Sequence, residues 1–176
     1  MGRPLTSFSL MAMGLAVSTL AGCSAVMPPS YAQNPLSPSG LETKALPDIK
    51  RRTIEGGSFD TSQARGKVTV VKFFAKYCEP CKRSLPWFER FARQHRDVVV
   101  LGIAEDERES DAREVAAAYG LTFPIVHDTG NALSGRFRVS DMPITFVADR
   151  KGRIRWVGGP DQTESDLEDA VSASSR

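Results

Sequence analysis

The sequence predicts an α/β sandwich with a mixed central sheet. Short apolar runs, which are typical of buried strands, alternate along the chain with segments whose apolar residues recur at helical spacing. Toward the C-terminus, two strand segments follow each other with only a turn between them, and a last helix closes the chain. Strands that alternate with helices and end in a hairpin and a helix indicate helices packed around one sheet.

The first part of the predicted domain holds a hairpin, a buried strand and a long helix. Residues 49–54 and 58–61 flank a turn that contains two glycines. Residues 68–75, VTVVKFFA, form a nearly continuous apolar run, as expected of a strand buried on both faces. Residues 80–95 have helical spacing, and Pro86 within them predicts a kink.

The second part supplies the remaining strands and helices. Gly120 follows one of the helices and is a favourable residue to end it. The expected strands are residues 97–104, 124–127, 144–148 and 154–157, and the expected helices are residues 110–119, 132–137 and 164–173.

The N-terminal segment has the pattern of an export signal. Residues 1–9 carry one positive charge, and residues 10–20, LMAMGLAVSTL, carry none. This run is too short to span a bilayer but suits the apolar part of a secretory signal. Residues 20–23, LAGC, resemble the bacterial lipobox, which implies that residues 1–22 are removed and that Cys23 receives a lipid. The alternative is an ordinary secretory signal cut after Ala32.

Residues 23–45 are rich in Pro and Ser, show no period, and are predicted to tether a domain of residues 46–176 to a membrane. Ser24 follows the lipobox cysteine in place of the Asp that commonly retains lipoproteins in the inner membrane, which favours the outer membrane if the cell is Gram-negative. The net charge of +2 and the lack of a basic run give no indication of a nucleic-acid partner.

The stretch KYCEPCKRSLP, residues 76–86, holds two of the three cysteines, and such a pair has three interpretations. A zinc site needs four ligands, usually in two close pairs, and His95 and His127 are not paired. A structural disulfide that closes so small a loop would stabilise the folded state only slightly, by about 2 kcal/mol in the chain-entropy model. The third interpretation is a redox dithiol.

The position of the pair between a buried strand and a helix favours the dithiol. Cys78 is expected near the N-cap of the helix and Cys81 in its first turn. Free backbone N–H groups and the helix dipole stabilise a thiolate at this place. Cys78 is therefore predicted to be the exposed nucleophile and Cys81 the resolving thiol.

Residues 73–81, FFAKYCEPC, resemble the active-site strand and turn of the thioredoxin fold. Pro86 matches the proline of its first helix, and residues 142–145, MPIT, match the loop whose cis-proline faces the dithiol. The Glu-Pro pair between the cysteines and the helix-bearing segment 105–124 are similar to the TlpA/ResA group of extracytoplasmic thioredoxins. The resemblance implies a thioredoxin-like three-layer sandwich with an N-terminal hairpin and an inserted helical segment.

The resemblance also implies an activity, namely a membrane-tethered thiol–disulfide oxidoreductase that needs no cofactor beyond the Cys78–Cys81 pair. Members of the group reduce cysteines of apocytochrome c or of other exported proteins, and a membrane thiol–disulfide carrier re-reduces them. Glu79 and Pro80 would support the dithiol, and the backbone of Met142, before cis-Pro143, would pair with an extended substrate. Two alternatives stay open: a thiol peroxidase of the peroxiredoxin branch and a non-catalytic binding lipoprotein.

Two positions depart from the family pattern. Lys72 stands where many thioredoxins carry a buried acid and the TlpA/ResA group often carries Asn. Its amine either extends to the surface or lies beneath the dithiol, where a cation would favour the thiolate. Ser84 replaces a Glu of ResA-type reductases, and Glu105 and Asp106 either supply an acidic group instead or are solvated loop charges.

Five other side chains have simpler expectations. Lys82 and Arg83 belong either to a solvated face or to the environment that lowers the pKa of Cys78. Tyr77 replaces a tryptophan and is expected to pack in a similar way. The two tryptophans, Trp87 and Trp156, are expected to pack in or beside the core.

Overall fold

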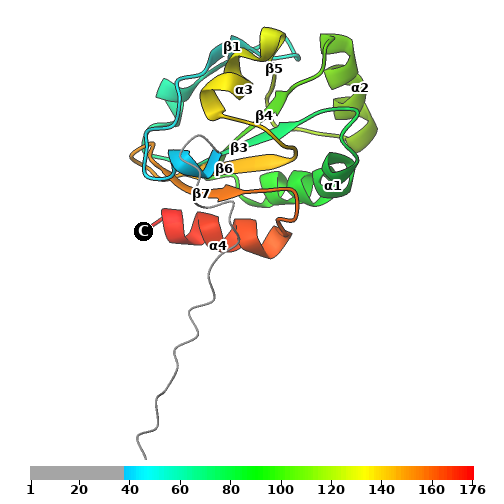
Figure 1. The fold of residues 1–176 in the computed structure, drawn as a ribbon. Helices are drawn as coiled ribbons and strands as arrows, with labels where there is room; N and C mark the ends of the chain where they lie inside the picture. Colours follow the sequence, from blue (N-terminus) through cyan, green and yellow to red (C-terminus); the bar gives the residue numbers. More distant parts are fainter. Residues whose placement is uncertain (1–37) are drawn as a thin grey trace, which may run out of the picture.

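A five-stranded sheet lies at the centre of the domain, with helices on both faces (Figure 1). The computed structural model describes residues 38–176. The strand order is β5-β4-β3-β6-β7. These strands are β3 (Thr69–Phe74), β4 (Val99–Ala104), β5 (Ile125–His127), β6 (Ile144–Ala148) and β7 (Ile154–Gly158).

The middle strand, β3, determines how the sheet is arranged. It pairs in parallel with β4 and antiparallel with β6, so the sheet is mixed, as predicted. Every residue of β3 is buried, because both faces of the strand are covered. The apolar run of its sequence follows from this position.

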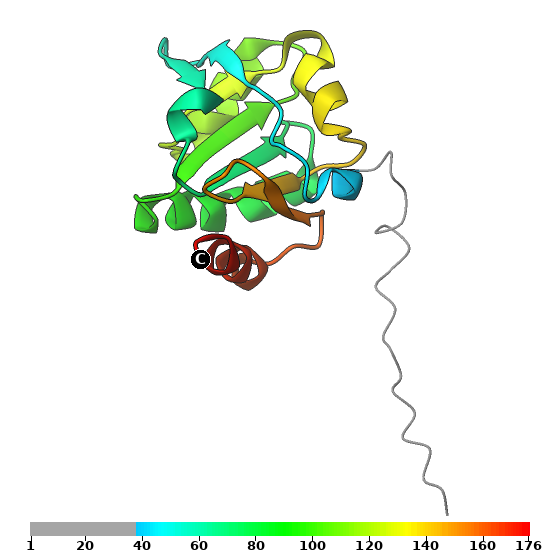
Figure 2. The same cartoon turned by 90° about the vertical axis from the view of Figure 1, so that its left-hand side faces the viewer.

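Four α-helices cover the sheet: α1 (Glu79–Gln94), α2 (Glu109–Tyr119), α3 (Ala132–Phe137) and α4 (Glu164–Ser174). Figure 2 shows α1 and α4 on one side of the sheet and α3 on the other. Alternate residues of β3 face the two cores. Val70 and Phe74 pack with α1, α2 and α4, whereas Val71 and Phe73 pack with α3. The predicted three-layer sandwich is confirmed.

The predicted N-terminal hairpin is present at the edge of the domain. Its strands, β1 (Lys50–Arg52) and β2 (Ser58–Asp60), pair antiparallel, and a bridge from Thr53 to Val126 joins the hairpin to β5. Three short 3₁₀ helices complete the described residues: η2 (Pro38–Leu41), η3 (Thr61–Ala64) and η4 (Thr129–Asn131).

The folded domain begins earlier than the predicted boundary at Leu46. Leu41 of η2 is buried in the core on the α3 side, and the backbone of Thr43 and Lys44 forms hydrogen bonds with Ile154 of β7. Residues 38–45 are therefore part of the domain, which corrects the C-terminal end of the predicted tether. The predicted signal peptide, Cys23 and the rest of the tether lie outside the described residues. Within residues 38–176, no helix has the length and apolarity to cross a membrane.

Gly158, the last residue of β7, makes room for two larger side chains. A Cβ at this position would lie 2.0 Å from the Trp156 ring and 2.5 Å from the Gln162 amide oxygen. Gly159, by contrast, has no atom within 4 Å of such a Cβ. The two adjacent glycines therefore form a matched pair for a packing test.

We expect Gly158→Ala to lower the free energy of unfolding by about 1–3 kcal/mol, because the Trp156 ring and Gln162 must move. Gly159→Ala should change it by less than about 0.5 kcal/mol. Urea denaturation followed by circular dichroism measures both. Equal effects of the two substitutions would contradict the packing at Gly158.

Candidate active site

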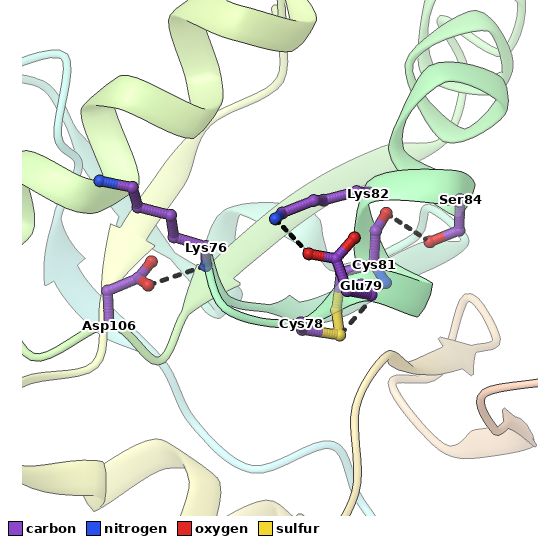
Figure 3. Close-up of a disulfide and its surroundings, with 7 residues drawn as sticks. All are labelled: Lys76, Cys78, Glu79, Cys81, Lys82, Ser84 and Asp106. Atoms are coloured by element: carbon purple, nitrogen blue, oxygen red, sulfur yellow. Dashed lines mark hydrogen bonds and ion pairs between the residues drawn. A yellow bond between two sulfur atoms is a disulfide. The ribbon is translucent and has the colours of Figure 1, made fainter.

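The two cysteines lie where β3 ends and α1 begins (Figure 3). Cys78 is the N-cap residue of α1, and its sulfur accepts the backbone N–H of Cys81 at 3.1 Å. The two residues are joined by a disulfide, with their Cα atoms 5.2 Å apart. A sulfur that caps a helix in this way also lies at the positive end of the helix dipole.

The two cysteines differ in their access to solvent. Cys78 retains 7% of its surface and Cys81 none. Cys78 lines a groove of about 460 Å³, and Cys81 does not. The predicted order of attack therefore fits the geometry, although Cys78 is less exposed than expected. The groove is lined by Tyr77, Cys78, Glu79, Pro80, Glu105, Val139, Ser140, Asp141 and Met142.

The first turn of α1 is held by local polar contacts (Figure 3). Lys82 forms an ion pair with Glu79 at 2.5 Å, and Pro80 occupies an early helical position where its missing N–H costs no bond. The hydroxyl of Ser84 donates to the Cys81 carbonyl at 3.0 Å. Ser84 thus stabilises the first turns of the helix through this hydrogen bond, and it does not line the groove.

The loop before β6 forms the opposite side of the groove. Antiparallel pairing of Phe73 with Ile144 brings the residues before Ile144 alongside those that follow β3 and lead to Cys78. The Met142–Pro143 peptide bond is cis, as the resemblance implies. Met142 lines the groove and packs against the core that contains the cysteines.

Glu105 and Asp106 are not solvated loop charges. Asp106 is buried, and its carboxylate accepts the backbone N–H of Lys76 at 2.8 Å, which anchors the loop before Cys78 (Figure 3). Glu105 lines the groove and accepts a hydrogen bond from Ser134. Burial raises the pKa of both carboxyl groups. Glu105 is therefore the acidic group beside Cys78, and Asp106 has a supporting position.

The sequence analysis did not identify Ser134 and Asp128, which are linked to Glu105 through the Ser134 hydroxyl. The Asp128 carboxylate is buried and accepts the backbone N–H groups of Leu133 and Ser134, which fixes the start of α3. The Ser134 hydroxyl lies within hydrogen-bond distance of both Asp128 and Glu105. An aspartate ahead of a short helix is the signal that could have indicated this anchor. Within residues 38–176, no cluster of His, Cys, Asp and Glu is arranged to hold a metal ion.

Three other expectations have clear outcomes. Trp87 and Trp156 are partly buried against the core, as predicted. Tyr77 is 68% exposed and lines the groove. Arg83 lies on the exposed face of α1.

Lys72 is buried within β3, and the interpretation that its amine extends to the surface is wrong. The residue has no exposed surface, and its Nζ atom has no hydrogen-bond partner. The amine lies 4.9 Å from the centre of the Phe88 ring and 5.3 Å from that of Trp87. Burial lowers the pKa of Lys72 from 10.5 to about 7. The amine therefore lies on the α1 side of the sheet, in the core that also contains Cys81.

This burial makes stability depend on pH in a defined window. Between about pH 7 and pH 10, the unfolded chain binds a proton at Lys72 that the folded protein lacks, so stability should rise with pH there. Each unit of pKa depression corresponds to about 1.4 kcal/mol. Lys72→Met should raise the free energy of unfolding at pH 7 by a few kcal/mol, and the gain should shrink at pH 9.

Urea denaturation at the two pH values measures this effect. The exposed Lys67→Met is the control and should show no such pH dependence. A gain that is the same at pH 7 and pH 9, or a loss of stability at pH 7, would be evidence against a buried amine of low pKa.

Comparisons with known proteins agree with this geometry. Residues 43–157 match the model of the AhpC/TSA family. The thioredoxin-like protein YneN of Bacillus subtilis is 29% identical over 131 residues, covering 72% of this chain and 76% of that protein. The thiol-disulfide oxidoreductase ResA of Geobacillus thermodenitrificans is 28% identical, covering 69% of this chain and 71% of that protein.

Solved structures show the same fold. The thiol:disulfide interchange protein DsbE of Chlorobium tepidum superposes with a TM-score of 0.71 at 23% identity, covering 76% of this chain and 96% of that one. StoA of Bacillus subtilis superposes with a TM-score of 0.63 at 26% identity, covering 70% and 96%. Because the family model spans well over half of the chain, this protein belongs to the AhpC/TSA family, as a ResA-like member with the thioredoxin fold.

Proposed function

We propose that this protein is a thiol–disulfide oxidoreductase that reduces disulfides of exported proteins through Cys78 and Cys81. The observation that carries the proposal is the Cys78–Cys81 disulfide at the N-terminus of α1, with Cys78 facing a groove and Cys81 buried behind it. The relatives named thiol-disulfide oxidoreductase support the same activity.

The reaction begins from the reduced pair. The Cys78 thiolate attacks one sulfur of the substrate disulfide, forms a mixed disulfide and releases one substrate thiol, which takes up a proton. Cys81 then loses its proton and attacks the Cys78 sulfur, which closes the Cys78–Cys81 bond and releases the second substrate thiol. A reductant, in our proposal a membrane thiol–disulfide carrier, restores the two protein thiols.

The groove supplies the place where the substrate lies. An extended segment can pair with the backbone of Met142 on one side while its sulfur faces Cys78. Glu105 and Asp141 give this groove acidic side chains. We propose that the substrates are exported cysteine-containing proteins, with apocytochrome c among the candidates because ResA-type reductases act on it.

The N-terminal sequence supports an extracytoplasmic place for this reaction. Export followed by lipid attachment at Cys23 would hold the enzyme at a membrane through residues 24–37. Attachment is stable when more than one acyl chain is present. Our proposal is a protein that acts outside the cytoplasm on the membrane surface, at the outer membrane in a Gram-negative cell.

A thiol peroxidase is the second candidate, because the AhpC/TSA model matches the chain. The residues directly before Cys78 are Ala75, Lys76 and Tyr77, and they lack the Thr or Ser and the proline of a peroxidatic site. Cys81 also lies one turn from Cys78 in a bonded pair, which suits exchange between disulfides. A non-catalytic lipoprotein is the third candidate and would show no redox turnover.

An insulin-reduction assay separates the three. With dithiothreitol as reductant, the wild-type protein should accelerate insulin reduction, and Cys78→Ser and Cys81→Ser should each return the rate to background because both thiols are needed. The same preparation should not accelerate hydrogen peroxide consumption. Peroxide turnover without insulin reduction would favour the peroxidase, and the absence of both activities would favour the binding lipoprotein.

Metabolic labelling with palmitate tests the anchor. The full chain, expressed in a bacterial host, should incorporate label and sediment with membranes, whereas Cys23→Ser should do neither, since the acceptor thiol is lost. Cys78→Ser keeps the acceptor and should behave as the wild type does. An unlabelled, soluble wild-type protein that begins after Ala32 would contradict the lipoprotein proposal.

A further inference from the structure

The charged side chains of the domain are distributed unevenly between the two ends of the central sheet. The cysteines lie at the end where β3 finishes, and the loop before β3 and the turn between β6 and β7 form the opposite end (Figure 1). These two segments and the start of β7 carry six exposed cations, which we call the basic end: Arg65, Lys67, Arg150, Lys151, Arg153 and Arg155.

Backbone pairing holds the two segments of the basic end side by side. Thr69 pairs with Ala148, so the start of β3 lies next to the end of β6. The Gly66 N–H, in the loop before β3, donates to the Arg150 carbonyl at 3.0 Å. The cations of both segments therefore belong to one continuous surface.

Part of the basic end lines a hollow of about 360 Å³ beside the C-terminal end of α4. Asp149 is the one acid in this lining, and its Oδ1 atom accepts the backbone N–H groups of Lys151 and Arg153, at 2.9 and 3.0 Å. Cations outnumber acids four to one here, so an anionic group in the hollow meets several positive charges. The lining consists of Asp149, Arg150, Lys151, Arg155, Ala173, Ser174 and Arg176.

Few acids neutralise the basic end. Arg155 reaches one acid, Asp149, at a distance of 3.9 Å, and Asp48 lines a neighbouring hollow together with Arg65 and Lys151. Near the cysteines, by contrast, the cations of the loop before Cys78 and of α2 are engaged by acids of α2. Among residues 38–176, four cations of the basic end form no ion pair: Lys67, Arg150, Lys151 and Arg153.

The chemistry of the basic end fits an anionic lipid surface better than a protein partner. The centre of a specific protein interface is rich in apolar and aromatic side chains. Within residues 38–176, the one exposed large hydrophobic side chain is Tyr77, which lines the cysteine groove at the other end. Clustered Lys and Arg side chains bind anionic headgroups by charge alone, and the hollow beside α4 can receive a headgroup phosphate.

The proposed lipid anchor brings this surface within reach of a membrane. Residues 24–37 separate Cys23 from the described domain, and a chain of this length extends to about 50 Å at most. Such a tether keeps the domain near the bilayer but does not orient it. A polybasic surface is the kind of second signal that makes attachment by a single lipid chain stable.

We propose that the basic end docks on an anionic lipid surface and turns the cysteine groove away from the bilayer. The attraction acts between exposed Lys and Arg side chains and lipid phosphates, and no covalent bond changes. In this orientation the groove stays open to protein substrates. The inference goes beyond the proposed thiol chemistry and does not depend on it.

Vesicle sedimentation tests the docking in the full chain without its lipid. Every protein carries Cys23→Ser, and each is mixed with vesicles of phosphatidylcholine, with or without phosphatidylglycerol. The apolar run of residues 10–20 is common to all, so the readout is the ratio of the two binding constants. Combined Arg150→Gln, Lys151→Gln and Arg155→Gln should lower this ratio about tenfold or more, because each cation near an anionic surface contributes about fivefold.

A matched control removes three exposed cations from α2, its N-cap and α3: Arg108→Gln, Arg113→Gln and Arg136→Gln. The change of net charge is the same, yet the ratio should stay close to that of the parent. High salt should abolish the preference of the parent for phosphatidylglycerol, because it screens surface charges. Inorganic phosphate at constant ionic strength should not displace the parent from the vesicles. Urea denaturation checks that both triple variants are folded.

A fluorophore reports the orientation of the bound domain. Ser62→Cys places one free thiol at the basic end, and Ala132→Cys places one at the start of α3, which follows the cysteine end of β5. The Cys78–Cys81 disulfide keeps the other cysteines from being labelled. A bimane at residue 62 should be quenched by lipids with spin-labelled headgroups, and one at residue 132 should not.

Several results would overturn the proposal. Equal binding to both kinds of vesicle would show no preference for anionic lipid, and an equal fall of the ratio in both triple variants would show an effect of net charge alone. Equal quenching at residues 62 and 132 would contradict the orientation. Displacement by inorganic phosphate would assign the hollow to a free anion, and binding of poly-glutamate in place of the vesicles would assign the surface to an acidic protein.

Discussion

The start of α1 against the end of β3 is the constraint on which the active site depends. A buried strand must give way to a helix whose first N–H groups lack partners within the helix, and the Cys78 sulfur accepts one of them. This places Cys78 at the positive end of the helix and Cys81 one turn further in. The cis-Pro143 loop, brought alongside by β6, and the Asp106 anchor complete the surroundings of this junction.

The buried Lys72 lowers the stability of this core, so its presence is not explained by stability. A charged amine in an apolar core is costly, and burial shifts the pKa of Lys72 toward neutrality in response. Rules of good packing are broken mostly where function requires it. The amine lies over the Phe88 ring, which belongs to the core that also contains Cys81, so this exception lies on the same side of the sheet as the redox pair.

Most of the fold and the two reactive cysteines could be predicted from the sequence. The apolar run of β3 and the helical spacing after Cys78 reflect local patterns, and the strands and helices occur close to their expected residues. Side-chain placement could not be predicted in the same way. A lysine side chain in a buried strand can either extend its amine to the surface or keep it in the core. Which of the two occurs at Lys72 depends on the tertiary packing around it, which the sequence pattern does not contain. Residues 38–45 have no hydrophobic period, so their sequence predicts a tether. Their attachment to β7 depends on backbone hydrogen bonds, which leave no pattern in the sequence.

The central claim is that Cys78 is the activated nucleophile and Cys81 its resolving partner. The most direct test is the alkylation of the reduced protein by iodoacetamide over a range of pH, with each modified cysteine identified by peptide mass spectrometry. The account predicts that Cys78 is modified first, with a midpoint below the value of about 8.5 for an ordinary cysteine. Equal modification of both cysteines, or a Cys78 midpoint at the ordinary value, would contradict it.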